Sequence, residues 1–136
     1  MNQQPTLTTE RLILRPYTLQ DAPDLQRLIG VREVAITMSY VPYPYPDGAA
    51  EEWINKHLER AEKGEFQFAI TDRTDGHLIG GIGFHEFDRQ SDCAEIGYWI
   101  AVPHWKNGYG TEAARVILKG DYPLKYSRRL EGELSE

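Results

Sequence analysis

The chain has 136 residues, of which 40% are hydrophobic and 26% are charged, with a formal net charge of −6 at pH 7. This length predicts one domain with a core of its own, and the composition is typical of a soluble globular protein. The acidic balance argues against a general nucleic-acid binder, and the single cysteine, Cys93, excludes an internal disulfide and a cysteine-based zinc site. No apolar run approaches the ~20 residues that span a bilayer, and the N-terminus is not a signal peptide, so we expect a cytoplasmic protein without a membrane partner.

The first predicted element is a strand over Leu7–Pro16, where apolar and polar residues alternate. A helix follows it, because Thr18 and Asp21 are both suited to be an N-cap and apolar residues then recur at helical spacing. This helix is expected to end near Gly30, since glycine is common just after the last helical turn.

Residues 38–46 form an aromatic, proline-rich loop in which Tyr40, Tyr43 and Tyr45 alternate with prolines that forbid a helix. Two interpretations stay open for this loop: a rigid connector that packs on the domain, or a wall of a substrate site. Asp47 is then predicted to cap a second helix, which ends near Gly64. Its buried face is expected to carry Ala50, Trp53, Ile54, His57 and Leu58.

Three antiparallel strands are predicted next, over Phe66–Ile70, Leu78–Phe84 and Ala94–Val102. Asp75-Gly76 is a hairpin signal between the first two of them, and a loop over residues 88–92 precedes the third. Glycines at 80, 81 and 83 should weaken or bulge the middle strand. A helix over Thr111–Lys119 follows the third strand.

Gly108 and Gly110 lie in the turn between the last strand and the last helix. The first N–H groups of a helix have no intrahelical acceptor, and the helix dipole favours an anion there. Glycines without Cβ would let a bulky phosphate approach this backbone closely. A lone Gly-x-Gly is also an ordinary turn, and the Gly-Lys-Ser/Thr of a P-loop is absent from the sequence. The surrounding residues therefore decide the interpretation.

These surroundings resemble the GNAT-type N-acetyltransferases, and more closely the ribosomal-protein N-terminal acetyltransferase (RimJ/RimL-like) subgroup. In that subgroup a Gly-Tyr-Trp-apolar strand leads through a proline and a tryptophan to Gly-Tyr-small-Thr-Glu-Ala, as it does here between Gly97 and Ala113. The opening Thr9–Leu12, with the sequence Thr-Glu-Arg-Leu, is a second point of resemblance. Lys106 departs from it, because the subgroup often has a glycine there, and Trp105 stands where the wider superfamily prefers Arg or Gln.

The resemblance implies an α/β fold, in which a mixed, mainly antiparallel sheet is flanked by helices. It covers residues 1–118, which we interpret as one GNAT-like N-acetyltransferase domain, and it leaves 119–136 as a divergent polar tail. The family's later strand, helix and closing hairpin find no counterpart, so we expect a C-terminally truncated domain. The strand Ala94–Val102 would then be an open edge of the sheet. We predict that Tyr122–Tyr126, of the same chain or of a homodimer partner, covers this edge.

By the same resemblance, the expected reaction is transfer of an acetyl group from the cosubstrate acetyl-coenzyme A to a primary amine. The pyrophosphate would be bound by the backbone N–H groups of Lys106, Asn107, Gly108, Tyr109, Gly110 and Thr111. The pantetheine amides would pair with the backbone of Ile100, Ala101 and Val102. The amine would lie against Tyr40, Tyr43 and Tyr45.

Glu95 is the predicted catalytic base, since many enzymes of the family carry a glutamate on the matching strand, and Glu86 is the second choice. An α-amino group has a pKa of ~8, so a carboxylate acting directly or through water is an adequate base. No general acid is assigned. We predict no metal site, because the histidines at 57, 77, 85 and 104 lack a metal-ligand spacing.

Two functions therefore follow from the sequence. The first is an acetyltransferase whose acceptor is a protein N-terminal α-amine, an amino sugar, a polyamine or an antibiotic amine. The second is a catalytically inactive, shortened GNAT homologue that acts as a coenzyme A-binding or oligomeric module. The intact glycine turn favours the first function, and the missing strands favour the second.

Overall fold

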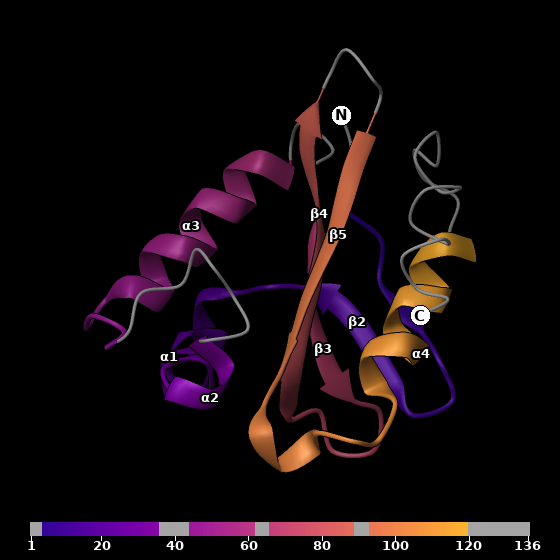
Figure 1. Cartoon of the computed structure of the whole chain (residues 1–136), viewed down its shortest axis with the longest axis horizontal. Coiled ribbons are helices and arrows are strands. Elements are labelled where there is room, and N and C mark those ends of the chain that lie inside the picture. Colours follow the sequence, from indigo (N-terminus) through magenta and orange to yellow (C-terminus); the bar gives the residue numbers. More distant parts are fainter. Residues whose placement is uncertain (1–3, 36–43, 62–65, 89–92, 120–136) are drawn as a thin grey trace.

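The computed structural model describes residues 4–35, 44–61, 66–88 and 93–119, and the side chains of 35, 84–88, 93–96 and 118–119 lie outside that description. Within this part of the chain, five antiparallel strands form one sheet in the order β1-β2-β3-β4-β5 (Figure 1). The strands are β1 (Leu7–Thr8), β2 (Leu12–Pro16), β3 (Gln67–Asp72), β4 (Leu78–Asp88) and β5 (Cys93–Ile100). The helices are η1 (Leu19–Asp21), α1 (Ala22–Ile29), α2 (Arg32–Ala35), α3 (Ala49–Ala61), η2 (Val102–His104) and α4 (Tyr109–Lys119). The α/β fold class predicted from the sequence is confirmed.

Helices cover both faces of the sheet: α1, α2 and α3 lie on one side and α4 on the other (Figure 1). The core under α4 consists of Leu12, Leu14, Phe66, Phe68, Ile70, Ile79, Ile82, Ala113, Ala114 and Ile117. The core under α1–α3 consists of Tyr17, Ala22, Leu25, Ile29, Val34, Ala50, Ile54, Ala69, Leu78, Trp99 and Ala101. Among the described residues, no helix is long and apolar enough to cross a membrane.

The sequence predicted one continuous strand over Leu7–Pro16. In the structure this segment folds into a short hairpin instead. β1 pairs with β2, Leu7 lying opposite Leu14, and the chain turns over residues 9–11. Thr9 makes this turn, because its N–H donates to the Leu12 carbonyl at 2.8 Å and its hydroxyl accepts from the Leu12 N–H at 2.9 Å. A side chain that hydrogen-bonds nearby backbone groups competes with a strand ladder, which explains the break in the predicted strand.

Helix α1 is entered through Thr18 and Asp21, as predicted. The Asp21 carboxylate accepts from the Thr18 N–H at 2.8 Å and from both terminal nitrogens of Arg15, at 2.7 and 2.8 Å. The pKa of Asp21 is lowered: burial alone would raise it, but the hydrogen bonds from Arg15 and Thr18 outweigh burial. The helix ends at Gly30, again as predicted, and the four-residue helix α2 after it was not predicted.

Helix α3 differs from the prediction in its cap and in one buried position. The N–H of Ala50 is bonded by the side chain of Gln26 on α1, at 3.2 Å, and not by Asp47. Ala50, Ile54 and His57 are buried, whereas Leu58 is 40% exposed, so its predicted burial was wrong. One residue beyond His57 is a further 100° around the helix, which turns Leu58 away from the sheet.

The glycines of β4 allow close contacts as well as the predicted bulge. Ile70 pairs with Gly80 but Thr71 pairs with Leu78, so Ile79 is an extra residue that bulges β4 against β3. A Cβ on Gly81 would lie 2.5 Å from the indole nitrogen of Trp99 on the neighbouring strand. At Gly81, β4 therefore passes directly against the buried Trp99 ring. A side chain at this position would force the ring or the strand to move.

Strand β5 is an edge of the sheet within the described residues. It ends at Ile100, two residues earlier than predicted, because Val102 and Pro103 turn into η2. The Ala101 N–H still extends the pairing, since it donates to the Ile79 carbonyl at 2.8 Å. Residues 122–126, which we predicted to cover this edge, lie outside the described residues, so that prediction is untested.

Candidate functional site

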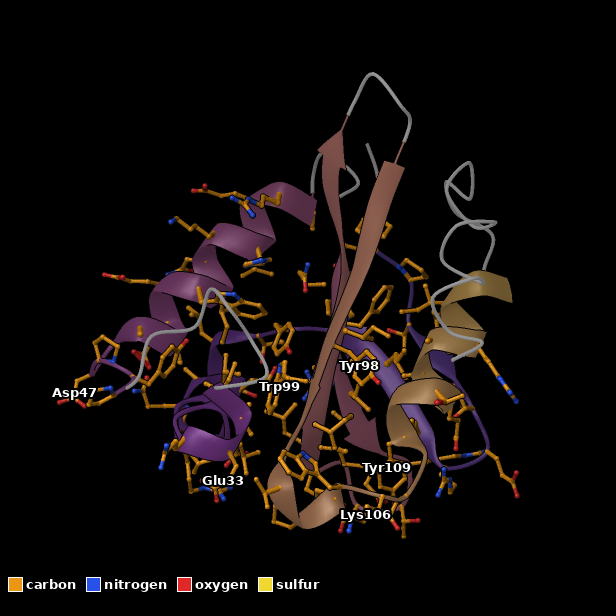
Figure 2. The ribbon with its side chains drawn as sticks, in the orientation of Figure 1. Glu33, Asp47, Tyr98, Trp99, Lys106 and Tyr109 are labelled. Carbon is orange, nitrogen blue, oxygen red and sulfur yellow. The ribbon has the colours of Figure 1, made fainter. Side chains whose placement is uncertain are left out.

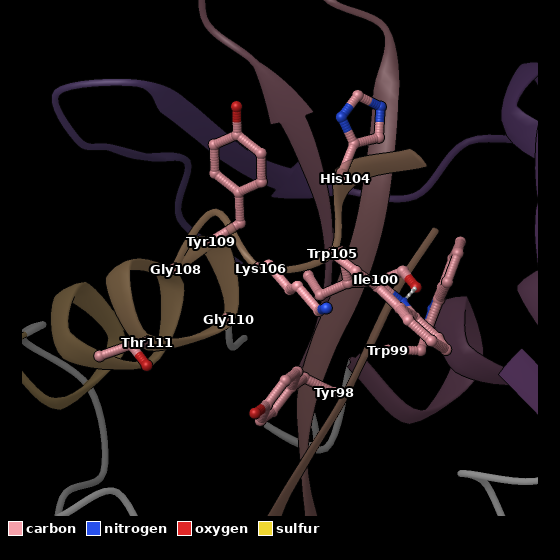
Figure 3. Close-up of a pocket in the computed structure, with 10 residues that line it drawn as sticks. All are labelled: Tyr98, Trp99, Ile100, His104, Trp105, Lys106, Gly108, Tyr109, Gly110 and Thr111. Atoms are coloured by element: carbon pink, nitrogen blue, oxygen red, sulfur yellow. Dashed lines mark hydrogen bonds between the residues drawn. The ribbon is translucent and has the colours of Figure 1, made fainter. Parts of the chain in front are cut away.

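A pocket of about 440 Å³ lies where β5 ends and α4 begins. Its walls are the end of β5, the η2 turn with the loop after it, and the first turn of α4 (Figure 3). The lining residues are Tyr98, Trp99, Ile100, His104, Trp105, Lys106, Gly108, Tyr109, Gly110 and Thr111. The predicted phosphate turn therefore forms one wall of a pocket.

The loop enters α4 through two residues with left-handed backbone, Lys106 with φ +67° and Gly108 with φ +76°. Only glycine adopts this conformation without strain, which accounts for the glycine that the RimJ/RimL-like subgroup often has at the position of Lys106. The Lys106 side chain points into the pocket (Figure 3). This departure from the family pattern adds a positive charge to the wall that was predicted to bind phosphate.

Helix α4 begins at Tyr109, two residues earlier than predicted. Its first intrahelical bond runs from the Glu112 N–H to the Gly108 carbonyl, at 3.0 Å. The N–H groups of the turn before Glu112 therefore have no acceptor inside the helix, and the positive end of the helix dipole lies there. These N–H groups, of Tyr109, Gly110 and Thr111, belong to the six that were predicted to bind the pyrophosphate.

Gly110 also makes room for a neighbouring ring, which the sequence did not predict. A Cβ on Gly110 would lie 2.4 Å from the ring of Tyr98, so the missing side chain makes room for that ring on β5. Tyr98 points from β5 towards α4, whereas Trp99 points towards α1–α3 (Figure 2). Tyr98 is nevertheless 48% exposed, and its ring forms part of the pocket wall.

The two sequence motifs that carry the family resemblance meet at Glu112. Its carboxylate accepts from the Thr9 hydroxyl, from the Arg11 N–H at 3.1 Å and from Arg11 Nε at 2.7 Å. Arg11 also donates from Nη2 to the Asn107 carbonyl at 2.9 Å, and its guanidinium lies 4.4 Å from the centroid of the Tyr109 ring. We call Thr9, Arg11 and Glu112 the N-terminal clamp. It fixes the loop and the first turn of α4 to the β1–β2 hairpin.

The charges of the clamp stabilise one another. Burial raises the pKa of Glu112, but hydrogen bonds from Thr9 and Arg11 outweigh it and leave the pKa below its usual value. The hydrogen bond with Glu112 raises the pKa of Arg11. An ionised glutamate in the first turn of a helix also interacts favourably with the helix dipole. The clamp is a feature that sequence reasoning missed, although both motifs were identified.

Six of the nine predicted cofactor residues line the pocket: Ile100, Lys106, Gly108, Tyr109, Gly110 and Thr111. The other three, Ala101, Val102 and Asn107, lie beside it and hold the loop in place. Ala101 is fully buried and its N–H is bonded to Ile79, while the Val102 carbonyl accepts from the Trp105 N–H at 3.1 Å. The Asn107 side chain donates to the His104 carbonyl at 3.1 Å.

The backbone at the end of β5 is only partly available to a ligand. The Ile100 carbonyl already accepts from the indole N–H of Trp105 at 2.6 Å (Figure 3). A carbonyl oxygen has two lone pairs, so this contact leaves room for a second donor. The pocket residues that the sequence analysis did not select are Tyr98, Trp99, His104 and Trp105. Tyr98, Trp99 and Trp105 belong to the quoted motif, which is the signal that could have identified them.

The remaining predicted site residues are placed only in part. Glu95 lies on β5 opposite His85, and Glu86 lies on β4 opposite Ala94. Their side chains lie outside the description, as do Tyr40 and Tyr43 altogether. Tyr45 is described, and it packs against the core under α1–α3, where burial raises the pKa of its hydroxyl. Tyr45 therefore packs on the domain, while its role as a substrate residue and Glu95 as the base both stay predictions.

Comparisons with known proteins agree in indicating an acetyltransferase. Residues 11–120 match the family model described as an acetyltransferase (GNAT) domain. The chain is 34% identical to the uncharacterized N-acetyltransferase YoaA of Bacillus subtilis over 125 residues, which are 91% of this chain and 71% of that protein. It is 29% identical to the uncharacterized N-acetyltransferase p20 of Bacillus licheniformis over 130 residues, 95% of this chain and 72% of that one.

Among solved structures, the fold is similar to that of a candidate ribosomal-protein-serine acetyltransferase of Vibrio cholerae, with a TM-score of 0.70 and 28% identity. The match covers 87% of this chain and 67% of the other. The chain thus spans between 67% and 72% of the length of these three relatives.

Proposed function

Because the chain belongs to the GNAT acetyltransferase family, we propose that the pocket between β5 and α4 binds acetyl-coenzyme A and that a protein N-terminal α-amine is the acceptor. The family's reaction is transfer of an acetyl group from acetyl-coenzyme A to an amine, and the relatives are named N-acetyltransferases. The chain is thus an enzyme of the N-acetyltransferase class. The cofactor site, the acceptor and the catalytic residue are the new parts of this proposal.

The observation that carries the proposal is the donor set at the start of α4. The N–H groups of the turn after Gly108 face an open pocket, at the positive end of an eleven-residue helix. Lys106 adds a side-chain cation on the same wall (Figure 3). A pyrophosphate needs several donors and a positive potential, and both are available on this wall.

The rest of the cosubstrate would extend along β5. As an edge strand of the described sheet, β5 offers backbone groups that an amide-bearing pantetheine arm can pair with. The acetyl group would then lie near the side of the sheet that carries α1–α3, beside Trp99 (Figure 2). Glu95 on the same strand would take the proton of the acceptor ammonium, directly or through water.

Two observations favour an N-terminal α-amine over the other acceptors. The Vibrio cholerae structure that the fold resembles is described as a ribosomal-protein-serine acetyltransferase. The opening Thr9–Leu12, which the RimJ/RimL-like subgroup shares, supplies two residues of the N-terminal clamp, Thr9 and Arg11. Membership of that subgroup would make protein N-termini the natural acceptors.

Calorimetric titration with coenzyme A tests the cofactor site. We expect binding in the wild type and at least roughly five-fold weaker binding in Lys106→Gln, because a phosphate loses a charged partner. Lys56→Gln, on the exposed face of α3, is the matched control and should bind like the wild type. Equal affinity in all three proteins would overturn the site.

Acetyl transfer to a panel of amines tests the acceptor. The panel holds peptides with free N-termini, the same peptides with blocked N-termini, a polyamine and an aminoglycoside. We expect turnover with the free N-termini alone. Turnover with a small amine would move the acceptor to that class, and coenzyme A binding without turnover on any amine would support the inactive binding module.

A further inference from the structure

Two histidines that are 27 residues apart in the sequence meet beside the pocket. His77 follows the turn between β3 and β4, and His104 ends η2. Their Nε2 atoms lie 3.3 Å apart, and their ring centroids lie 5.1 Å apart. The fold therefore assembles a histidine pair that no spacing in the sequence reveals.

The carboxylate of Asp75 fixes how His77 presents its ring. Asp75 Oδ1 contacts His77 Nδ1 and also accepts from the His77 backbone N–H at 3.0 Å. With the Nδ1 proton held by Asp75, His77 Nε2 carries a lone pair, and this lone pair faces His104. A histidine that binds a metal through one ring nitrogen usually donates the N–H of the other ring nitrogen to a carboxylate or a similar acceptor.

The separation of the two nitrogens suits a shared cation. Two imidazole nitrogens bound at ~2.0–2.1 Å to one tetrahedral Zn²⁺ lie ~3.3–3.4 Å apart. A direct N–H···N hydrogen bond between His104 and His77 is the alternative, and 3.3 Å is long for such a bond. Replacing the shared proton by Zn²⁺ needs only a tautomer change, in which the proton of His104 moves from Nε2 to Nδ1.

The charges around the pair also favour a cation. Asp72 lies in the same cluster, and one ligand atom from each of Asp72, Asp75 and His77 falls within 4.8 Å of the others. Asp72 and Asp75 also lie close enough to act on His104 as negative charges.

We propose that His77 and His104 form a binding site for Zn²⁺ or a similar divalent transition-metal ion, with Asp75 as the positioning carboxylate and water completing the coordination. The site takes no part in the proposed acetyl transfer, but it adjoins the pocket proposed for coenzyme A, which His104 also lines. It would connect the β3–β4 turn to the η2 turn that leads into the loop before α4. The His104 ring lies against Tyr109, the first residue of α4, at 6.0 Å between centroids.

The test is titration of the protein with ZnCl₂ in competition with a chromophoric chelator. We expect one Zn²⁺ per chain, a loss of affinity beyond ~100-fold in His77→Gln and in His104→Gln, and a loss of ~10-fold in Asp75→Asn. His85→Gln is the matched control, because it removes a histidine elsewhere on β4, and it should bind like the wild type.

An NMR measurement on the wild type avoids reliance on the variants. Imidazole ¹⁵N shifts should report a proton on Nε2 of His104 without metal and on Nδ1 of both histidines with Zn²⁺. Absence of Zn²⁺ binding in the wild type would overturn the proposal. So would affinity that survives loss of either histidine, a loss as large in His85→Gln, or imidazole shifts that Zn²⁺ leaves unchanged.

Discussion

Replacing Glu112 by Gln should destabilise the protein by more than the loss of a surface charge. The substitution keeps the shape of the side chain but removes the negative charge that Arg11 and Thr9 contact. The partly exposed ion pair with Arg11 contributes up to ~1 kcal/mol after screening by solvent. The helix dipole contributes about 0.5 kcal/mol, and a weakened bond to the Thr9 hydroxyl contributes about as much.

These contributions give an expected loss of ~1–2 kcal/mol for Glu112→Gln, or ~4–7 °C in Tm for a domain of this size. Chemical denaturation monitored by circular dichroism measures it. Glu52→Gln is the matched control, since Glu52 also lies in the first turn of a helix but is exposed. It should cost no more than ~0.5 kcal/mol, because it loses only the dipole interaction.

The pH dependence provides an independent test. The folded-state pKa of Glu112 is lowered from 4.5, so its contribution to stability is fully present above the unfolded pKa. That contribution is lost as the pH falls through the folded-state pKa. The stability difference between wild type and Glu112→Gln should therefore be constant near neutral pH and shrink below pH 4.5. Equal losses in Glu112→Gln and Glu52→Gln, or a difference unchanged down to pH 3, would refute the reasoning.

Three further predictions concern the pocket. Lys106→Gly should raise the free energy of unfolding by ~1 kcal/mol, because glycine adopts φ +67° without strain, and it should weaken coenzyme A binding. Denaturation measures the first effect and calorimetry the second, and a less stable variant would contradict the reasoning. Gly110→Ala should lower Tm, because the Cβ of the new alanine would lie 2.4 Å from the Tyr98 ring, and adding Tyr98→Ala should restore part of that loss. A double-mutant cycle that shows no coupling between the two substitutions would contradict this contact. Glu95→Gln should lower turnover by roughly 100-fold with cofactor affinity unchanged, and full turnover at every pH would assign the base elsewhere.

Local patterns were sufficient to predict most of the fold. The Asp75-Gly76 signal placed the turn between β3 and β4 as predicted, with Gly76 at φ +79°. One error arose where a side chain from another part of the chain decides the local structure. Gln26 caps α3 in place of Asp47, and no pattern within residues 47–61 indicates that.

In the candidate site, too, local signals could be predicted from the sequence and long-range contacts could not. The glycine turn was found because a helix start with glycines is a local signal. The contact of Gly110 with the Tyr98 ring was not found, because that ring lies on another element. The N-terminal clamp and the His77–His104 pair join residues far apart in the sequence, so only the folded chain brings them together.

The clamp also has a consequence for how the protein folds. Arg11 and Glu112 are 101 residues apart, so their contact closes nearly the whole described chain. A contact of such high order carries a large loop-closure entropy, so we expect it to form late, after the sheet has assembled. Loss of the clamp should therefore accelerate unfolding and leave the folding rate almost unchanged. The loop before α4, which we propose binds coenzyme A, should thus reach its final geometry only when both ends of the described sheet are in place, so that binding would be coupled to completion of the fold.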